Sequence, residues 1–159
     1  MKTAKFHQYI LNFKRPSGTS RGILDTKETY FIEIFEDGKK GIGECSLFRG
    51  LSFDDDDDYE NALEWACRNI NLKLEDLQEE LVNHPSIIFG IEQALLNLEH
   101  QGDLYFPSDF TDGKDSIMIN GLIWMGETDY MQSQIEEKLE SNFTCIKLKI
   151  GTDWDSERE

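Results

Sequence analysis

The sequence predicts an α+β domain, a three-stranded antiparallel sheet with helices, followed by the opening of an α/β domain. Three observations support this fold class. The first third is rich in β-branched and aromatic residues, the middle third has helical periodicity, and the last third has a strand–helix–strand order. We expect the first domain over residues 1–102, a linker over 103–115, and the second domain over 116–159.

Three strands are expected in the first third. Residues 4–13 carry apolar side chains and end at a break over 15–18, which contains proline and glycine. Residues 29–35 combine aromatic and β-branched residues, and one face of this strand carries Tyr30, Ile32 and Ile34. Asp37-Gly38 is a hairpin turn signal that returns the chain into a strand over residues 41–45.

Helices are expected through the middle third. Apolar residues recur at helical spacing over residues 59–70 and again over 74–82, where Pro85 ends the pattern. Residues 87–98 follow the amphipathic pattern most closely, which predicts the best-buried helix of the chain. Gly102 is a plausible end for that helix.

The linker contains proline, glycine and aspartates without periodicity. After it we expect a strand over residues 116–123, a helix over 127–141, and a strand over 143–150. The helix should bury Met131, Ile135 and Leu139. Two strands joined by a helix form a parallel pair, which by itself leaves apolar faces and edges uncovered. We therefore expect residues 116–159 to be the start of a larger α/β domain.

Charge and cysteine content exclude several classes of partner. Sixteen basic against 32 acidic residues give a net charge of −16, which disfavours nucleic acids and anionic membranes as partners. An anionic small molecule would need a local pocket of positive charge. Three widely spaced cysteines, with neither a signal peptide nor a long apolar run, indicate free thiols in a cytoplasmic protein.

Two lysines in the last predicted strand are candidate catalytic groups. Alternation places Lys147 and Lys149 on one face together with Cys145, and Ile146, Leu148 and Ile150 on the other. In a partly dry site each ammonium disfavours the charged form of its neighbour, and desolvation acts in the same direction. A neutral lysine amine is a usable general base. The alternative is a half-exposed strand with a solvated lysine face.

The chain resembles the muconate-lactonising branch of the enolase superfamily, and within it the o-succinylbenzoate synthase family. The resemblance runs along the whole chain, although it covers under half of a complete member. Its most specific feature is the Lys-x-Lys that ends the second strand after the linker. The other matching segments are residues 15–22, 41–45, 48–52, 89–96 and 119–122.

This resemblance implies a capping domain over residues 1–102 and the first βαβ part of a (β/α) barrel over 116–159. It implies that Lys149 removes the proton α to a substrate carboxylate, while Lys147 is a supporting cation. Arg21 and Gly22 fall in a segment that matches a mobile capping loop closing over substrate. The implied cofactor is Mg²⁺, whose ligands in this family lie on later barrel strands, so no metal ligand is assigned here.

The implied activity of the full-length parent is that of a lyase. It dehydrates a cyclohexadiene carboxylate to o-succinylbenzoate in menaquinone biosynthesis, while the 159-residue chain alone is expected to be inactive. Two alternatives stay open: a racemase or epimerase of the same branch acting on N-acylamino acids or dipeptides, and a non-catalytic module. The partner in either enzyme is a small carboxylate, and the sequence leaves the oligomeric state undetermined.

The remaining chemistry-bearing residues favour structural roles. The aspartates at 54–58 lack the spacing of a calcium loop and suggest a solvated helix start. The glycines at 38, 41 and 43 precede no strand-to-helix turn, so they do not predict a phosphate site. A surface or structural role is expected for each of the histidines His7, His84 and His100. Packing, and not a stacking platform, is expected for the tryptophans Trp65, Trp124 and Trp154.

Overall fold

The computed structural model describes residues 1–19, 22–102 and 104–148. The chain divides into two compact units. The first comprises residues 1–12 and 26–107, and the second comprises residues 13–25 and 108–159. Each unit is described by itself below.

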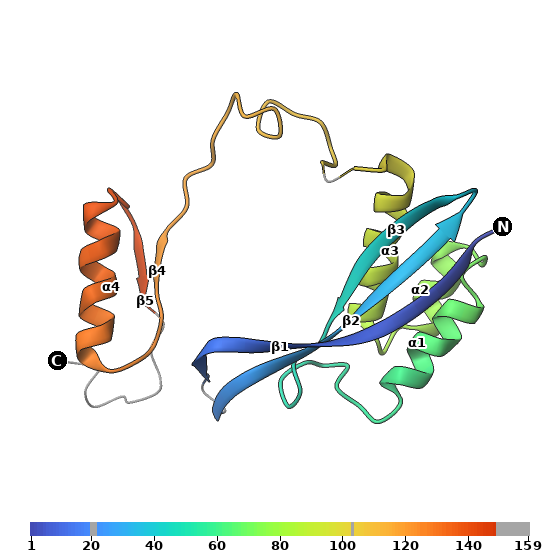
Figure 1. The fold of residues 1–159 in the computed structure, drawn as a ribbon, viewed down its shortest axis with the longest axis horizontal. Helices are drawn as coiled ribbons and strands as arrows, with labels where there is room; N and C mark the ends of the chain where they lie inside the picture. The colour runs from blue at the N-terminus through green and yellow to red at the C-terminus, as the bar shows by residue number, and fades with distance from the viewer. Residues whose placement is uncertain (20–21, 103, 149–159) are drawn as a thin grey trace. The chain divides into compact units, whose positions relative to one another are not determined.

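The sheet of the first unit has the strand order β1-β2-β3, with β1 at Thr3–Thr19, β2 at Gly22–Glu36 and β3 at Lys39–Ser46 (Figure 1). Strands β2 and β3 are antiparallel and pair from Thr29↔Ser46 to Glu36↔Lys39. The turn between them has positive φ at both Asp37 and Gly38, which confirms the predicted two-residue hairpin. The break predicted over residues 15–18 is wrong, because β1 continues through it.

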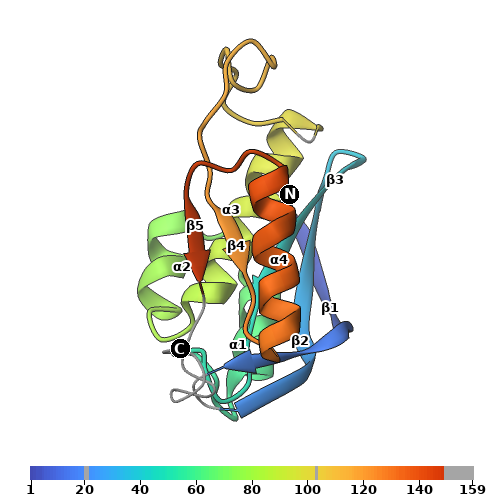
Figure 2. The same cartoon turned by 90° about the vertical axis from the view of Figure 1, so that its left-hand side faces the viewer.

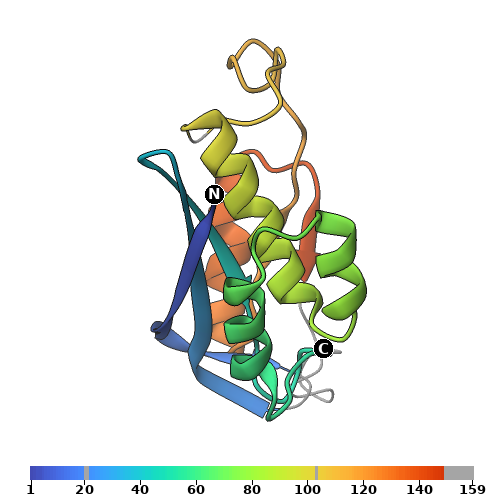
Figure 3. The ribbon, with the colours of Figure 1, turned by 90° about the vertical axis from the view of Figure 1, so that its right-hand side faces the viewer.

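Three helices cover one face of this sheet: α1 (Tyr59–Arg68), α2 (Leu74–Glu80) and α3 (Pro85–His100) (Figure 3). The predicted inward face of β2 is confirmed, since Tyr30, Ile32 and Ile34 are completely buried. They pack in one apolar cluster with side chains from all three helices, among them Leu63, Ala66, Leu77, Ile87, Ile91 and Ala94. Removal of this apolar surface from water is the main stabilising term of the unit.

Helix α3 lies so close to β3 that glycine is required on both elements. A Cβ built on Gly43 would lie 1.8 Å from the carbonyl oxygen of Gly90, and one built on Gly41 would lie 2.0 Å from that of Ala94. A Cβ on Gly90 would lie 2.3 Å from the sulfur of Cys45. Gly41 and Gly43 therefore serve backbone-to-backbone packing.

Two amide side chains of α3 also protect the outer edge of β3. Gln93 accepts a hydrogen bond from the backbone N–H of Glu44 at 2.8 Å, and Asn97 accepts one from Ile42 at 3.0 Å. Strand β3 is the last strand of the sheet, so these N–H groups have no neighbouring strand to bond. Two positions four apart on one helix thus satisfy two alternate amides of the strand edge.

The second unit contains β4 (Gly121–Ile123), α4 (Thr128–Glu140) and β5 (Ile146–Leu148), with α4 running alongside the two strands (Figure 2). The strands are parallel, as predicted, and pair Gly121↔Ile146, Leu122↔Lys147 and Ile123↔Leu148. Strand β4 is shorter than the predicted strand over residues 116–123, because residues 116–120 are not paired in a sheet.

The predicted buried stripe of α4 is only partly correct. Met131 and Ile135 are half-buried, whereas Leu139 is exposed. The buried residue of the helix is instead Gln134, whose side-chain amide bonds the backbone just beyond β4.

Candidate active site

The predicted catalytic strand presents Lys147 on the face of the small sheet that α4 leaves uncovered. Leu122 and Lys147 are register partners, so their side chains share a face. The adjacent positions belong to the other face: Ile123 is completely buried, and a Cβ on Gly121 would meet Lys138 of α4 at about 3 Å. Lys147 is exposed on its face. The register therefore separates the lysine from the face packed against the helix.

Lys149 and Arg21, two of the four predicted site residues, lie outside the described residues. Their roles stay predictions that rest on the resemblance. Gly22 is described: it begins β2, is exposed, and has a φ of 136°, a backbone conformation that side-chain-bearing residues rarely adopt. Gly22 and Lys147 are thus located on separate elements, and the substrate-binding role of Gly22 also stays a prediction.

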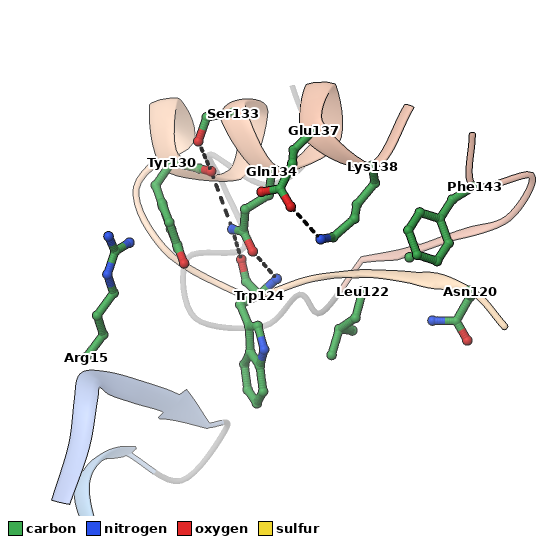
Figure 4. Close-up of a pocket in the computed structure, with 11 residues that line it drawn as sticks. Arg15, Asn120, Leu122, Trp124, Tyr130, Ser133, Gln134, Glu137, Lys138 and Phe143 are labelled. Atoms are coloured by element: carbon green, nitrogen blue, oxygen red, sulfur yellow. Dashed lines mark hydrogen bonds and ion pairs between the residues drawn. The ribbon is translucent and has the colours of Figure 1, made fainter. Parts of the chain in front are cut away.

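A hollow of about 530 Å³ in the second unit is lined mainly by residues in and around β4 and α4 (Figure 4). Arg15, from the end of β1, contributes a guanidinium 4.7 Å from the ring centroid of Tyr130, a cation–π contact. Trp124 also lines the hollow and is 42% exposed, so it is not a core residue, and its packing role stays a prediction.

Gln134, on α4, also lines the hollow and binds the backbone of Trp124. Its carbonyl oxygen accepts from the Trp124 N–H at 3.0 Å, and its amide donates to the Trp124 carbonyl at 3.1 Å (Figure 4). Sequence reasoning missed this residue. The available signal was a glutamine three residues after Met131 and directly before Ile135, inside the apolar stripe of the helix.

In the first unit, residues 48–52 form a closed turn at the end of β3. The N–H groups of Leu51 and Ser52 both donate to the carbonyl of Phe48, and the Phe48 N–H donates back to the Ser52 hydroxyl. Gly50 has a φ of 74° within this turn, and its N–H donates to the carboxylate of Asp55. These bonds give the turn a defined shape.

Arg49 attaches this turn to the sheet through two carboxylates. Its guanidinium donates to both oxygens of Glu28 on β2, at 2.8 and 3.2 Å, and to Asp55 at 2.8 Å. The hydroxyl of Tyr30 lies 2.6 Å from Glu28. Hydrogen bonds from Arg49 favour the carboxylate of Glu28 and lower its pKa to about 2. Because its donors already bind two carboxylates, Arg49 is a structural cation of the first unit.

We expect Arg49→Met to lower the free energy of unfolding by about 2 kcal/mol at neutral pH, since it removes charge-assisted bonds from partly buried carboxylates. The pKa of Glu28 in the folded state is about 2, below its ordinary value of 4.5. Its stabilisation is therefore present above pH 4.5 and is lost as the pH falls toward 2. The variant should show less of this acid dependence. Urea unfolding at neutral and acidic pH measures both effects.

The matched control is Arg68→Met. Arg68 pairs with Glu64 at 3.7 Å on the surface of α1, and both side chains are exposed, so its loss should cost about 0.5 kcal/mol or less. Equal stability of the two variants at neutral pH would contradict the structural role of Arg49.

The acidic run at residues 54–58 is in part the predicted solvated helix start, because Asp56, Asp57 and Asp58 are exposed and Asp58 directly precedes α1. The first aspartate of the run differs. Asp54 is buried, and its carboxylate accepts from the Ser86 N–H in the first turn of α3 at 2.8 Å. Asp56 lies 3.1 Å from the ring of His84, which is also buried, so the structural role predicted for this histidine is confirmed. Within residues 1–19, 22–102 and 104–148, no cluster of three metal-ligating side chains is present.

The cysteines are in the state that the sequence predicts, and the helices can be compared with the length of a membrane span. Cys45, Cys67 and Cys145 are free thiols, and burial raises the pKa of the Cys67 thiol to about 11. Among the helices that the structure describes, none combines the length and apolar character needed to span a membrane.

Comparison with known proteins identifies the family. The family model described as MenC, N-terminal domain, matches residues 1–98. The o-succinylbenzoate synthase of Desulfotalea psychrophila is 38% identical, over 92% of this chain and 49% of its own length. The chain therefore spans about half the length of this relative.

Solved structures give the same assignment. The crystal structure of MenC from D. psychrophila LSv54 has a TM-score of 0.72 and 32% identity, covering 98% of this chain and 50% of that chain. The o-succinylbenzoate synthase of Thermosynechococcus elongatus BP-1, solved with Mg in its active site, has a TM-score of 0.69. It is 16% identical over 98% of this chain and 45% of that chain, which shows a shared fold. The chain belongs to the MenC family.

Proposed function

We propose that this chain supplies the capping domain and the first two barrel strands of a metal-dependent carbon–oxygen lyase that forms o-succinylbenzoate. The family assignment and the 38% identical synthase of D. psychrophila support the proposal. The observation that carries it within this chain is the register of β5. That register presents Lys147 on the sheet face opposite the helix, which in a βα barrel is the interior.

The chemistry assigned to this chain is proton transfer and carboxylate binding. Lys149 acts as the base that removes the proton α to the substrate carboxylate, and Lys147 is the neighbouring cation that disfavours protonation of Lys149 and pairs with the carboxylate. The protonated Lys149 then returns this proton to the departing β-hydroxyl, which leaves as water, and the ring becomes aromatic. Lys147 lies in β5, and the predicted strand over residues 143–150 puts Lys149 near its carboxyl end, where βα barrels carry their catalytic groups.

The proposed Mg²⁺ would act as a Lewis acid toward the carboxylate. The described residues of this chain do not fit a metal site, because they contain no cluster of three suitable ligands. The proposal therefore assigns the metal ligands to barrel strands beyond residue 159, and we expect the 159-residue chain alone to have no turnover.

The test is an assay of the full-length protein that carries this chain, with Mg²⁺, for o-succinylbenzoate formation from its cyclohexadiene precursor. We expect synthase turnover by the full-length protein and none by residues 1–159. Epimerisation of dipeptides without synthase turnover would instead support the epimerase alternative. A dipeptide epimerase from Cytophaga hutchinsonii has a TM-score of 0.62 at 22% identity. At this identity the likeness shows a shared fold and does not support epimerase activity for this chain.

A further inference from the structure

Trp124 directly follows β4, and a single buried side chain holds both polar groups of its backbone. Gln134 accepts from the Trp124 N–H at 3.0 Å and donates to the Trp124 carbonyl at 3.1 Å. Gln134 is only 9% exposed, so these bonds form in a partly dehydrated environment, where a missing partner costs most. The pair of bonds fixes the position and the orientation of the Trp124 peptide groups.

The fixed backbone directs the Trp124 side chain away from α4. Leu122 and Trp124 are two residues apart, as neighbours on one strand face are, and Figure 4 shows both side chains pointing away from the helix. Leu122 is the register partner of Lys147. The indole of Trp124 and the side chain of Lys147 therefore project from the same face of the small sheet. The Trp124 side chain is 42% exposed.

We infer that Trp124 is a specificity-determining residue and that Gln134 is the positioning residue that holds it. The inference rests on the proposed function and extends it to the substrate ring. Residues just beyond the carboxyl ends of barrel strands contact ligands, and the flat apolar face of an indole suits a planar six-membered ring. The ligand class is therefore a cyclic carboxylate whose ring packs against Trp124.

The alternative is that Gln134 stabilises only the fold. Amide exchange of the 159-residue chain first tests whether it fixes Trp124. Gln134→Leu keeps the size of the side chain and removes both bonds, so we expect exchange at the Trp124 amide to rise by about tenfold or more. The matched control is Gln132→Leu on the exposed face of the same helix. Unchanged exchange at Trp124 in the Gln134 variant would overturn the positioning role.

Kinetics of the full-length protein test the contact with the substrate. We expect Trp124→Ala to raise KM by about tenfold, the equivalent of about 1.4 kcal/mol, with a change in kcat of about threefold or less. Gln134→Leu should raise KM in the same direction. Trp65→Phe, at a half-buried position against the core of the first unit, serves as the control.

The protein's own fluorescence gives a second readout. Titration with o-succinylbenzoate should change the tryptophan emission of the unmodified full-length protein and of Trp65→Phe. The change should be absent in Trp124→Phe. An active enzyme whose KM and emission change are insensitive to Trp124 would overturn the inference alone. A full-length protein without synthase turnover would overturn the proposed function and the ligand role of Trp124 together, while amide exchange would still decide the positioning role of Gln134.

Discussion

Replacing Gly43 with alanine is expected to lower the free energy of unfolding of the first unit by about 3 kcal/mol or more. The added Cβ would lie 1.8 Å from the carbonyl oxygen of Gly90. Both atoms belong to backbone, on β3 and α3, so no side-chain rotation relieves the overlap. The helix must move away from the strand, which also weakens the bonds from Gln93 and Asn97 to the edge of β3.

Urea unfolding of the 159-residue chain, followed by far-UV circular dichroism, measures this loss. The matched control is Gly102→Ala, where the nearest atom to an added Cβ is 3.8 Å away. We expect that control to stay within about 0.5 kcal/mol of the unmodified chain. A Gly43→Ala variant as stable as the control would contradict the close approach of α3 to β3.

Substituting Lys149 with alanine is expected to reduce kcat of the full-length protein by up to about 10⁴-fold, the upper end of the range of about 10²- to 10⁴-fold that a positioned general base contributes. Lys147→Ala should cost about 10²-fold, because a neighbouring cation assists binding and charge balance without taking the proton. Both estimates follow from the proposed roles of the two lysines on one strand face.

Steady-state kinetics of o-succinylbenzoate formation compare these variants. Lys114→Ala is the control, since Lys114 pairs with Asp112 on the exposed segment before β4. Circular dichroism should show that all three variants stay folded. A kcat of Lys149→Ala close to that of the control would show that Lys149 is not the base. A larger loss of kcat in Lys147→Ala than in Lys149→Ala would show that Lys147 is the base and Lys149 the supporting cation.

The parts of the fold that sequence predicted well are those set by local patterns. The alternation of Tyr30, Ile32 and Ile34 fixed the buried face of β2, and the helical apolar pattern identified α3. The Asp37-Gly38 signal located the hairpin, because few other residues adopt positive φ at both positions. The exposed side chain of Lys147 in β5 agrees with the same period-two argument, whereas the shared face with Lys149 stays a prediction.

The parts that sequence missed depend on contacts between distant segments. Asp54 is buried because Ser86, 32 residues later, offers it an N–H, and nothing in the aspartate run indicates that partner. Arg49 lies next to Glu28 only after β2 and the turn at 48–52 have folded. Gln134 was not singled out, because the strand end that it bonds lies 10 residues earlier.

The central claim is that residues 116–159 begin the barrel of a two-lysine, metal-dependent synthase. Sequencing of the source DNA beyond the codon for Glu159 tests it most directly. The account predicts that the same reading frame continues through further βα units, with acidic residues at three successive strand ends and then another lysine. A stop codon directly after Glu159, with no continuation nearby, would contradict the account and leave Lys147 and Lys149 without a catalytic partner.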